Sequence, residues 1–212
     1  MLTIIYNGTG KLMHSSSNTR ANSIVKRTFD LAFALALSLP ALTACLLCAM
    51  VVWIECRANP FFVQVRVGKH ARPFRLIKIR TMLPSTSDLP THEVGTVAVL
   101  RSGRFLRASK LDELPQLWNV ITGAMSFVGP RPCLQRQTEL INARQELGVL
   151  DIRPGITGPA QLAGIDMSTP RKLAEADARY LAQASIKTDL RILLRTLLGA
   201  GSGDRINTQG AG

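Results

Sequence analysis

The sequence predicts a small mixed α/β domain, mostly helical, carried on an N-terminal membrane helix. Three observations predict this class. Residues 31–54 contain no charged side chain and, as a helix, are long enough to cross a bilayer core of roughly 30 Å. Two short segments, 61–65 and 74–79, have the composition and alternation of β-strands. Apolar residues then recur at helical spacing in much of the remaining chain.

The chain is expected to divide into four segments. Residues 1–25 are polar and rich in Ser, Asn and Thr, which predicts a loose tail. Residues 26–57 form the membrane-embedded segment, and residues 58–198 form the globular domain. Residues 199–212 are rich in Gly and polar side chains and are expected to be disordered.

Within the globular domain, helices are predicted over 111–121, 171–184 and 186–198. Residues 83–97 contain Pro, Ser, Thr and Gly without periodicity, which is typical of a loop. The last helix mixes leucines with lysine and arginine. It therefore suits either packing on the domain or lying on a membrane surface.

Pro40 lies near the middle of the apolar segment, and Ser38 is close to it. Proline removes a helical hydrogen bond and crowds the preceding turn, so a kink is expected there. Because spanning helices tolerate proline, the residues alone leave two topologies open. The segment either spans the bilayer or enters it, breaks and returns to the same face.

The net charge of +12 and the pI near 10.4 predict a polyanionic partner. Nucleic acid, an anionic membrane and a phosphorylated substrate all fit that charge. A nucleic-acid binder would need aromatic stacking platforms, but aromatic residues are only 5% of the chain, so no nucleic-acid partner is expected. The Cys45-x-x-Cys48 pair lacks a second ligand pair, so small buried thiols in a reducing compartment are expected rather than a zinc site.

Asp112 and Glu113 are the first candidates for chemistry. They open a helical pattern, with Pro115 in its first turn, where the helix dipole stabilises carboxylates. An ionised Asp is a competent nucleophile toward phosphorus, and a neighbouring Glu can hold Mg²⁺ against a diphosphate. The same pair is also a common way to begin a helix, so alone it leaves both interpretations open.

Four arginines are candidates for binding phosphate or nucleotide, because a guanidinium offers forked donors to phosphate oxygens. Arg104 and Arg107 precede the acidic pair, Arg131 stands between two prolines, and Arg153 adjoins a Pro-Gly turn. Solvated arginines at tight turns remain the alternative for the last two.

Further motifs occur in a distinctive order between Lys26 and Leu198: Lys26-Arg27-x-x-Asp30, Pro60-Phe61-Phe62, Arg66-Val67-Gly68, residues 74–82, residues 111–120, Gly129-Pro130-Arg131-Pro132 and residues 153–158. In these motifs the sequence resembles the bacterial sugar transferases, also called monotopic phosphoglycosyl transferases. That family initiates O-antigen, capsule, exopolysaccharide or glycoprotein glycan assembly.

The resemblance implies a role for each candidate residue. Asp112 matches the nucleophile that attacks the β-phosphorus of a UDP-sugar and expels UMP. Glu113 matches its Mg²⁺-binding partner, and Arg107 matches a phosphate-binding arginine. Arg131 and Arg153 match arginines near the nucleotide or phosphate. The phosphosugar on the aspartate then passes to a polyprenyl phosphate carrier, expected to be undecaprenyl phosphate.

The family's apolar segment is a re-entrant helix, broken at a Ser-Pro, with both ends in the cytoplasm. In relatives the break is expected near Thr43, about one helical turn beyond Pro40. Nucleotide sugars are cytosolic, whereas a spanning helix preceded by Lys26 and Arg27 would place the domain outside. We therefore expect a re-entrant helix at the cytoplasmic face of the bacterial inner membrane, with the basic surface facing anionic lipid headgroups.

A catalytically inactive relative that acts as a membrane scaffold is the second alternative, and the intact Asp112-Glu113 pair argues against it. The sequence predicts neither the sugar, nor the polysaccharide pathway, nor the oligomeric state.

Overall fold

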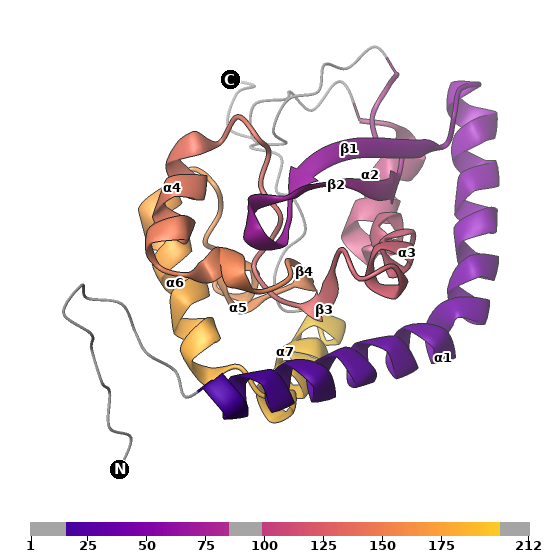
Figure 1. Cartoon of the computed structure of the whole chain (residues 1–212). Coiled ribbons are helices and arrows are strands. Elements are labelled where there is room, and N and C mark those ends of the chain that lie inside the picture. The colour runs from indigo at the N-terminus through magenta and orange to yellow at the C-terminus, as the bar shows by residue number, and fades with distance from the viewer. Residues whose placement is uncertain (1–15, 85–98, 200–212) are drawn as a thin grey trace.

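The computed structural model describes residues 16–84 and 99–199, with side chains from residue 23 onward. Figure 1 shows a mostly helical domain that lies on the inner side of a bend in one long helix, α1 (Ser16–Cys56). The mostly helical class and the apolar N-terminal helix are confirmed. The prediction of a loose tail is wrong for residues 16–25, which belong to α1. No Gly or Pro precedes Pro40 in the helix, so nothing stops it from extending toward the N-terminus.

Helix α1 has two arms, which lie on either side of Pro40, its only proline. The bend visible in Figure 1 is the kink that a proline inside a helix produces. In the first arm, Ala34 is fully buried in a core with Val120 and Phe127. In the second arm, Val52 is fully buried in a separate core. Both arms thus contribute to the interior of the same domain.

The outward side of α1 is apolar and exposed. Within its most apolar stretch only 17% of residues are buried, so packing on the domain leaves most of that surface uncovered. Among the described residues it is the one helix with the length and hydropathy to cross a membrane. The exposed side chains include Leu35, Leu39, Leu42, Leu46 and Leu47.

A β-hairpin follows α1, and it confirms the two predicted strands. Strands β1 (Phe61–Val67) and β2 (Pro73–Ile79) pair antiparallel, with Phe61 opposite Ile79. A short 3-10 turn, Lys69–Ala71, joins them. The loop predicted over 83–97 lies almost wholly outside the described residues.

The single helix predicted over 111–121 is interrupted in the structure. Helix α2 (Arg101–Ser109) is followed by a separate 3-10 turn, Leu111–Glu113, and then by α3 (Gln116–Ile121). Pro115 has no N–H to donate to the carbonyl four residues earlier, so an α-helix cannot run through it unbroken. Asp112 and Glu113 therefore lie in a tight turn ahead of α3 rather than inside its first turn.

The remaining elements complete the domain. They are β3 (Ser126–Val128), α4 (Thr138–Glu146), the 3-10 turn Val149–Asp151, β4 (Gly155–Thr157), α5 (Pro159–Leu162), α6 (Pro170–Gln183) and α7 (Ile186–Leu197). The helices predicted over 171–184 and 186–198 are confirmed to within a residue. A buried ion pair of 2.7 Å between Arg144 and Asp177 joins α4 to α6. Arg144 also donates to the carbonyl of Arg131 over 2.9 Å, which fixes the backbone at that arginine.

Strands β3 and β4 pair in parallel and bring two of the sequence motifs into direct backbone contact. A Cβ atom added to Gly155 would lie 2.1 Å from the amide nitrogen of Gly129. The Gly129-Pro-Arg-Pro loop and the Arg153-Pro-Gly turn can therefore approach this closely only because both positions lack a side chain.

Helix α7 combines the two roles that the sequence left open. Its inner face is packed, with Asp189 and Ile192 buried, while Leu194 and Leu197 are 60% and 79% exposed. Asp189 pairs with Lys26 of α1 and accepts a hydrogen bond of 2.6 Å from Tyr180 of α6. Burial, and then the Asp189 carboxylate, raise the pKa of Tyr180, so its hydroxyl stays protonated as the donor. The first arm of α1 is thereby fixed to α6 and α7.

Candidate active site

A cavity of about 480 Å³ lies where the Leu111–Glu113 turn faces α1, β3, β4, α5 and α7. Its volume is in the range of small-molecule sites. Asp112, Glu113, Arg107 and Arg131 all line it, so the fold brings together four of the residues predicted from the sequence. Its remaining lining is largely apolar.

Asp112 lies in the 3-10 turn and is only 7% exposed. The residue that places it there is Lys110, which adopts a left-handed conformation with φ of 59° and ends α2. That conformation is unfavourable for a residue with a side chain, and strain of this kind is concentrated at functional sites. The reversal lets Arg107 at the end of α2 and Asp112 after it line the same cavity.

Glu113 is held by cations from two other elements. Its Oε1 lies 3.2 Å from Nζ of Lys78 on β2 and 3.5 Å from Nη1 of Arg131, in the loop after β3. With Arg107 and Lys110 also lining the cavity, basic groups outnumber the two carboxylates. A site of this charge attracts an anionic ligand such as a phosphate or diphosphate.

Arg107 offers an unused donor. Its Nε donates to Oγ1 of Thr81 over 2.8 Å, which orients the guanidinium. Its Nη1 is buried and has no hydrogen-bond partner among the described residues. A buried charged donor without an acceptor is costly, so this nitrogen is suited to an oxygen of a bound ligand.

The sequence profile of the family described as "Bacterial sugar transferase" matches residues 21–201 of this chain. The chain belongs to the bacterial sugar transferase family.

Individual relatives agree with that assignment. The chain is 37% identical to an uncharacterized sugar transferase, EpsL, of Bacillus subtilis over 82% of its own length and 86% of the relative. It is 36% identical to a UDP-glucose:undecaprenyl-phosphate glucose-1-phosphate transferase of Caulobacter vibrioides, over 81% of its length and 68% of the relative. It is 33% identical to a protein of the same name from Escherichia coli, over 83% of its length but only 40% of that relative.

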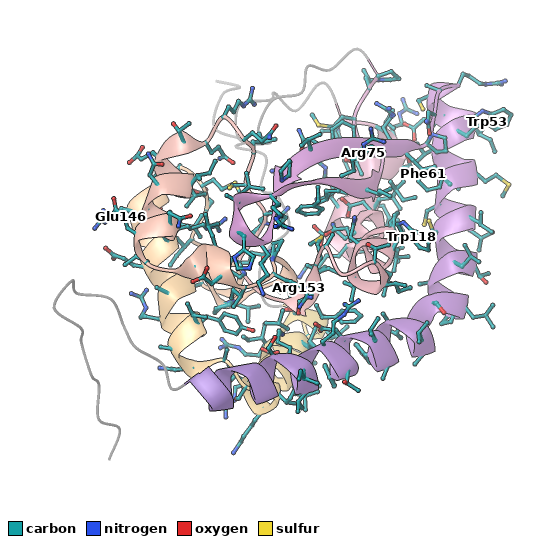
Figure 2. The ribbon with its side chains drawn as sticks, in the orientation of Figure 1. Trp53, Phe61, Arg75, Trp118, Glu146 and Arg153 are labelled. Atoms are coloured by element: carbon teal, nitrogen blue, oxygen red, sulfur yellow. The ribbon has the colours of Figure 1, made fainter. Side chains whose placement is uncertain are left out.

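Two predicted residues of this sugar transferase lie outside the cavity lining. Arg104 is exposed on α2. Arg153, labelled in Figure 2, donates from Nε to the carbonyl of Gly123 over 2.8 Å. Arg27 donates to the carbonyls of Val120 and Ile121 nearby, so both cations interact with the C-terminal end of α3. Arg153 therefore binds the backbone that follows α3 and does not line the cavity.

Sequence reasoning missed several residues of the sugar transferase site. Lys78 had a weak signal, as one of two basic residues in an otherwise apolar strand, but its partner Glu113 is 35 positions away. Gln161 had no signal in the sequence. Its Nε2 donates to the Ile156 carbonyl, and its buried Oε1 accepts no hydrogen bond from the residues that the structure describes. Phe33 and Leu37 line the cavity from α1, where only a membrane role was expected.

The two carboxylates suit the expected magnesium ion only if other ligands complete its coordination. The described residues contain no group of three or more His, Cys, Asp or Glu side chains placed to hold a metal ion. Mg²⁺ is commonly held by one or two carboxylates, with substrate phosphates and water completing its shell. Asp112 and Glu113, which both line the cavity, suit an ion that arrives with a diphosphate.

Proposed function

We propose that this sugar transferase moves a sugar-1-phosphate from a UDP-sugar to undecaprenyl phosphate, releases UMP and thereby initiates a surface polysaccharide or glycoconjugate. The observation that carries the proposal is the Asp112–Glu113 pair in a cavity rich in cations. The Caulobacter and Escherichia relatives are named for this reaction with glucose. Relatives named for galactose and N-acetylgalactosamine also match, so the reaction type is proposed here without a particular sugar.

The proposed reaction has two steps. A carboxylate oxygen of Asp112 attacks the β-phosphorus of the UDP-sugar and forms a new P–O bond. The bond from that phosphorus to the bridging oxygen breaks, and the oxygen leaves with UMP. A phosphate oxygen of the carrier then attacks the same phosphorus, which restores the carboxylate and yields polyprenyl diphosphosugar.

The cations around the pair suit both steps. Nη1 of Arg107 is available to a phosphate oxygen, and Arg131 and Lys78 reduce the local negative charge that would repel a diphosphate. Mg²⁺ held at Glu113 would neutralise the diphosphate further and so make its phosphorus more open to attack. The burial of Asp112 limits the access of water, which would otherwise hydrolyse an aspartyl phosphate.

A panel of UDP-sugars tests this proposal. Detergent-solubilised enzyme with undecaprenyl phosphate should release UMP from at least one UDP-sugar and form lipid-linked diphosphosugar in equal amount. The measurement is UMP release together with mass spectrometry of the lipid. Release of UDP, or of free sugar phosphate with no lipid product, would point to a glycosyl transferase or a hydrolase instead.

We also propose that α1 is re-entrant and holds the enzyme on the cytoplasmic face of the inner membrane. Two contacts support this. Lys26 near the start of α1 pairs with Asp189, and Glu55 near its end accepts a hydrogen bond of 2.7 Å from the Arg101 amide at the start of α2. Both ends of the apolar stretch are thus fastened to one domain, which cannot lie on two sides of a bilayer.

Thiol labelling tests the topology. In a variant whose four native cysteines are alanine, Ser23→Cys before the apolar stretch and Thr169→Cys before α6 occupy exposed positions. Both should be shielded from an impermeant thiol reagent in intact cells and labelled after lysis. Labelling of one position alone in intact cells would show that α1 spans the membrane.

A further inference from the structure

The reaction cavity has two chemically different sides. Its polar side carries Asp112, Glu113 and the cations described above. Its apolar side is the lining from α1 and α7, which apart from Thr196 is apolar and consists of Phe33 and Leu37 from α1 and Leu193 and Leu197 from α7. A UDP-sugar is charged and rich in hydroxyl groups, so it uses the polar side. The apolar side calls for a ligand with a hydrocarbon part.

The apolar side is formed by the two elements whose outer surfaces need an apolar environment. The first arm of α1 exposes Leu35 and Leu39 to 60% and 75%, and α7 exposes Leu194 and Leu197. Figure 1 shows α7 beside this arm, and the Lys26–Asp189 pair joins the two helices. Leu197 lines the cavity and is 79% exposed, so it stands at the cavity mouth.

We propose that Phe33, Leu37, Leu193 and Leu197 form the seat for the phosphate-proximal isoprene units of the carrier lipid. The carrier enters from the bilayer between α1 and α7, and its phosphate arrives beside Asp112. This inference rests on the proposed function and adds to it the residues that select the acceptor. The membrane helix α1 is then part of the acceptor site as well as an anchor.

The hydroxyls of Thr157 and Thr196 agree with a hydrocarbon occupant. Thr157 and Thr196 line the cavity near the leucines, but their hydroxyls hydrogen-bond each other over 2.8 Å. Thr196 also donates to the carbonyl of Ile192. These hydroxyls are therefore engaged within the protein, and the surface beside them is left to apolar contact.

The test separates the two half-reactions in Leu197→Gln, a change at an exposed position, where substitutions have little effect on folding. The acceptor is geranyl phosphate, a soluble probe with two isoprene units, so that changes in membrane binding do not affect the measured KM. Its KM should rise about tenfold, because a polar amide replaces an apolar contact in the seat. Formation of the sugar-phosphate adduct on the enzyme, measured without acceptor, should change far less. Leu37→Asn, deeper in the same wall, should act in the same direction.

Leu198→Gln is the matched control, because it is the adjacent leucine, is 86% exposed and does not line the cavity. Its KM for geranyl phosphate should equal that of the wild type. An unchanged KM in Leu197→Gln and Leu37→Asn, or an equal rise in the control, would overturn the seat. A loss confined to adduct formation would assign this wall to the UDP-sugar. If the wild type forms no adduct and releases no UMP, the proposed function itself fails.

Discussion

Replacing Asp112 with asparagine is expected to lower turnover by several orders of magnitude. The amide keeps the shape of the side chain in its 3-10 turn but removes the negative charge and with it the nucleophile. Wild-type enzyme incubated with UDP-sugar and without carrier should gain the mass of one sugar phosphate on the peptide that contains Asp112. In Asp112→Asn that adduct should be missing.

Asp151→Asn provides the control, because this carboxylate is 73% exposed in another part of the fold. It should retain wild-type turnover. Circular dichroism and membrane fractionation should show that Asp112→Asn still folds and still associates with the membrane. Substantial activity in Asp112→Asn, or an adduct on a different residue, would replace the two-step mechanism with direct transfer to the carrier.

Replacing Glu113 with glutamine is expected to lower turnover about 10²–10³-fold, a loss typical of removing one electrostatic group from an active site. A neutral amide is a poor ligand for a hard cation. It also removes the carboxylate charge that Lys78 and Arg131 contact at this position. EDTA should abolish wild-type activity and Mg²⁺ should restore it, while Glu113→Gln should need a higher Mg²⁺ concentration for its residual rate.

The matched control is Glu146→Gln, which removes a carboxylate that is 60% exposed and paired with Arg171 at the surface. It should show the Mg²⁺ dependence of the wild type. Full activity of the wild type in EDTA would remove the metal from the mechanism and leave Glu113 as a partner of the two cations alone.

Sequence patterns predicted the elements whose formation depends mainly on neighbouring residues. Alternation identified both strands of the hairpin, and apolar periodicity identified α6 and α7. The break before α3 was missed, although the missing N–H of Pro115 carries the reason within the sequence itself. The early start of α1 was missed because Ser, Asn and Thr are also common in irregular segments, whereas only Gly or Pro would have opposed the helix strongly.

The candidate site was only partly predictable, because tertiary contacts decide which arginine reaches the cavity. Arg131 and Arg153 look alike in the sequence, since each adjoins a proline in a short turn. The close contact of Gly129 with Gly155 brings their two loops together, yet only Arg131 lines the cavity. Lys78 lies 35 positions from Glu113, and no local pattern reports such a pairing.

The way in which α1 enters the cores has a consequence for how the protein matures. Ala34 and Val52, from the two arms, are fully buried among residues of the globular domain. A domain synthesised without α1 would have two open grooves where these side chains belong. Excising the helix therefore yields an incomplete protein rather than a soluble version of it. Because the outward leucines of α1 are exposed, one helix both closes the interior of the domain and carries the surface that an apolar environment would cover.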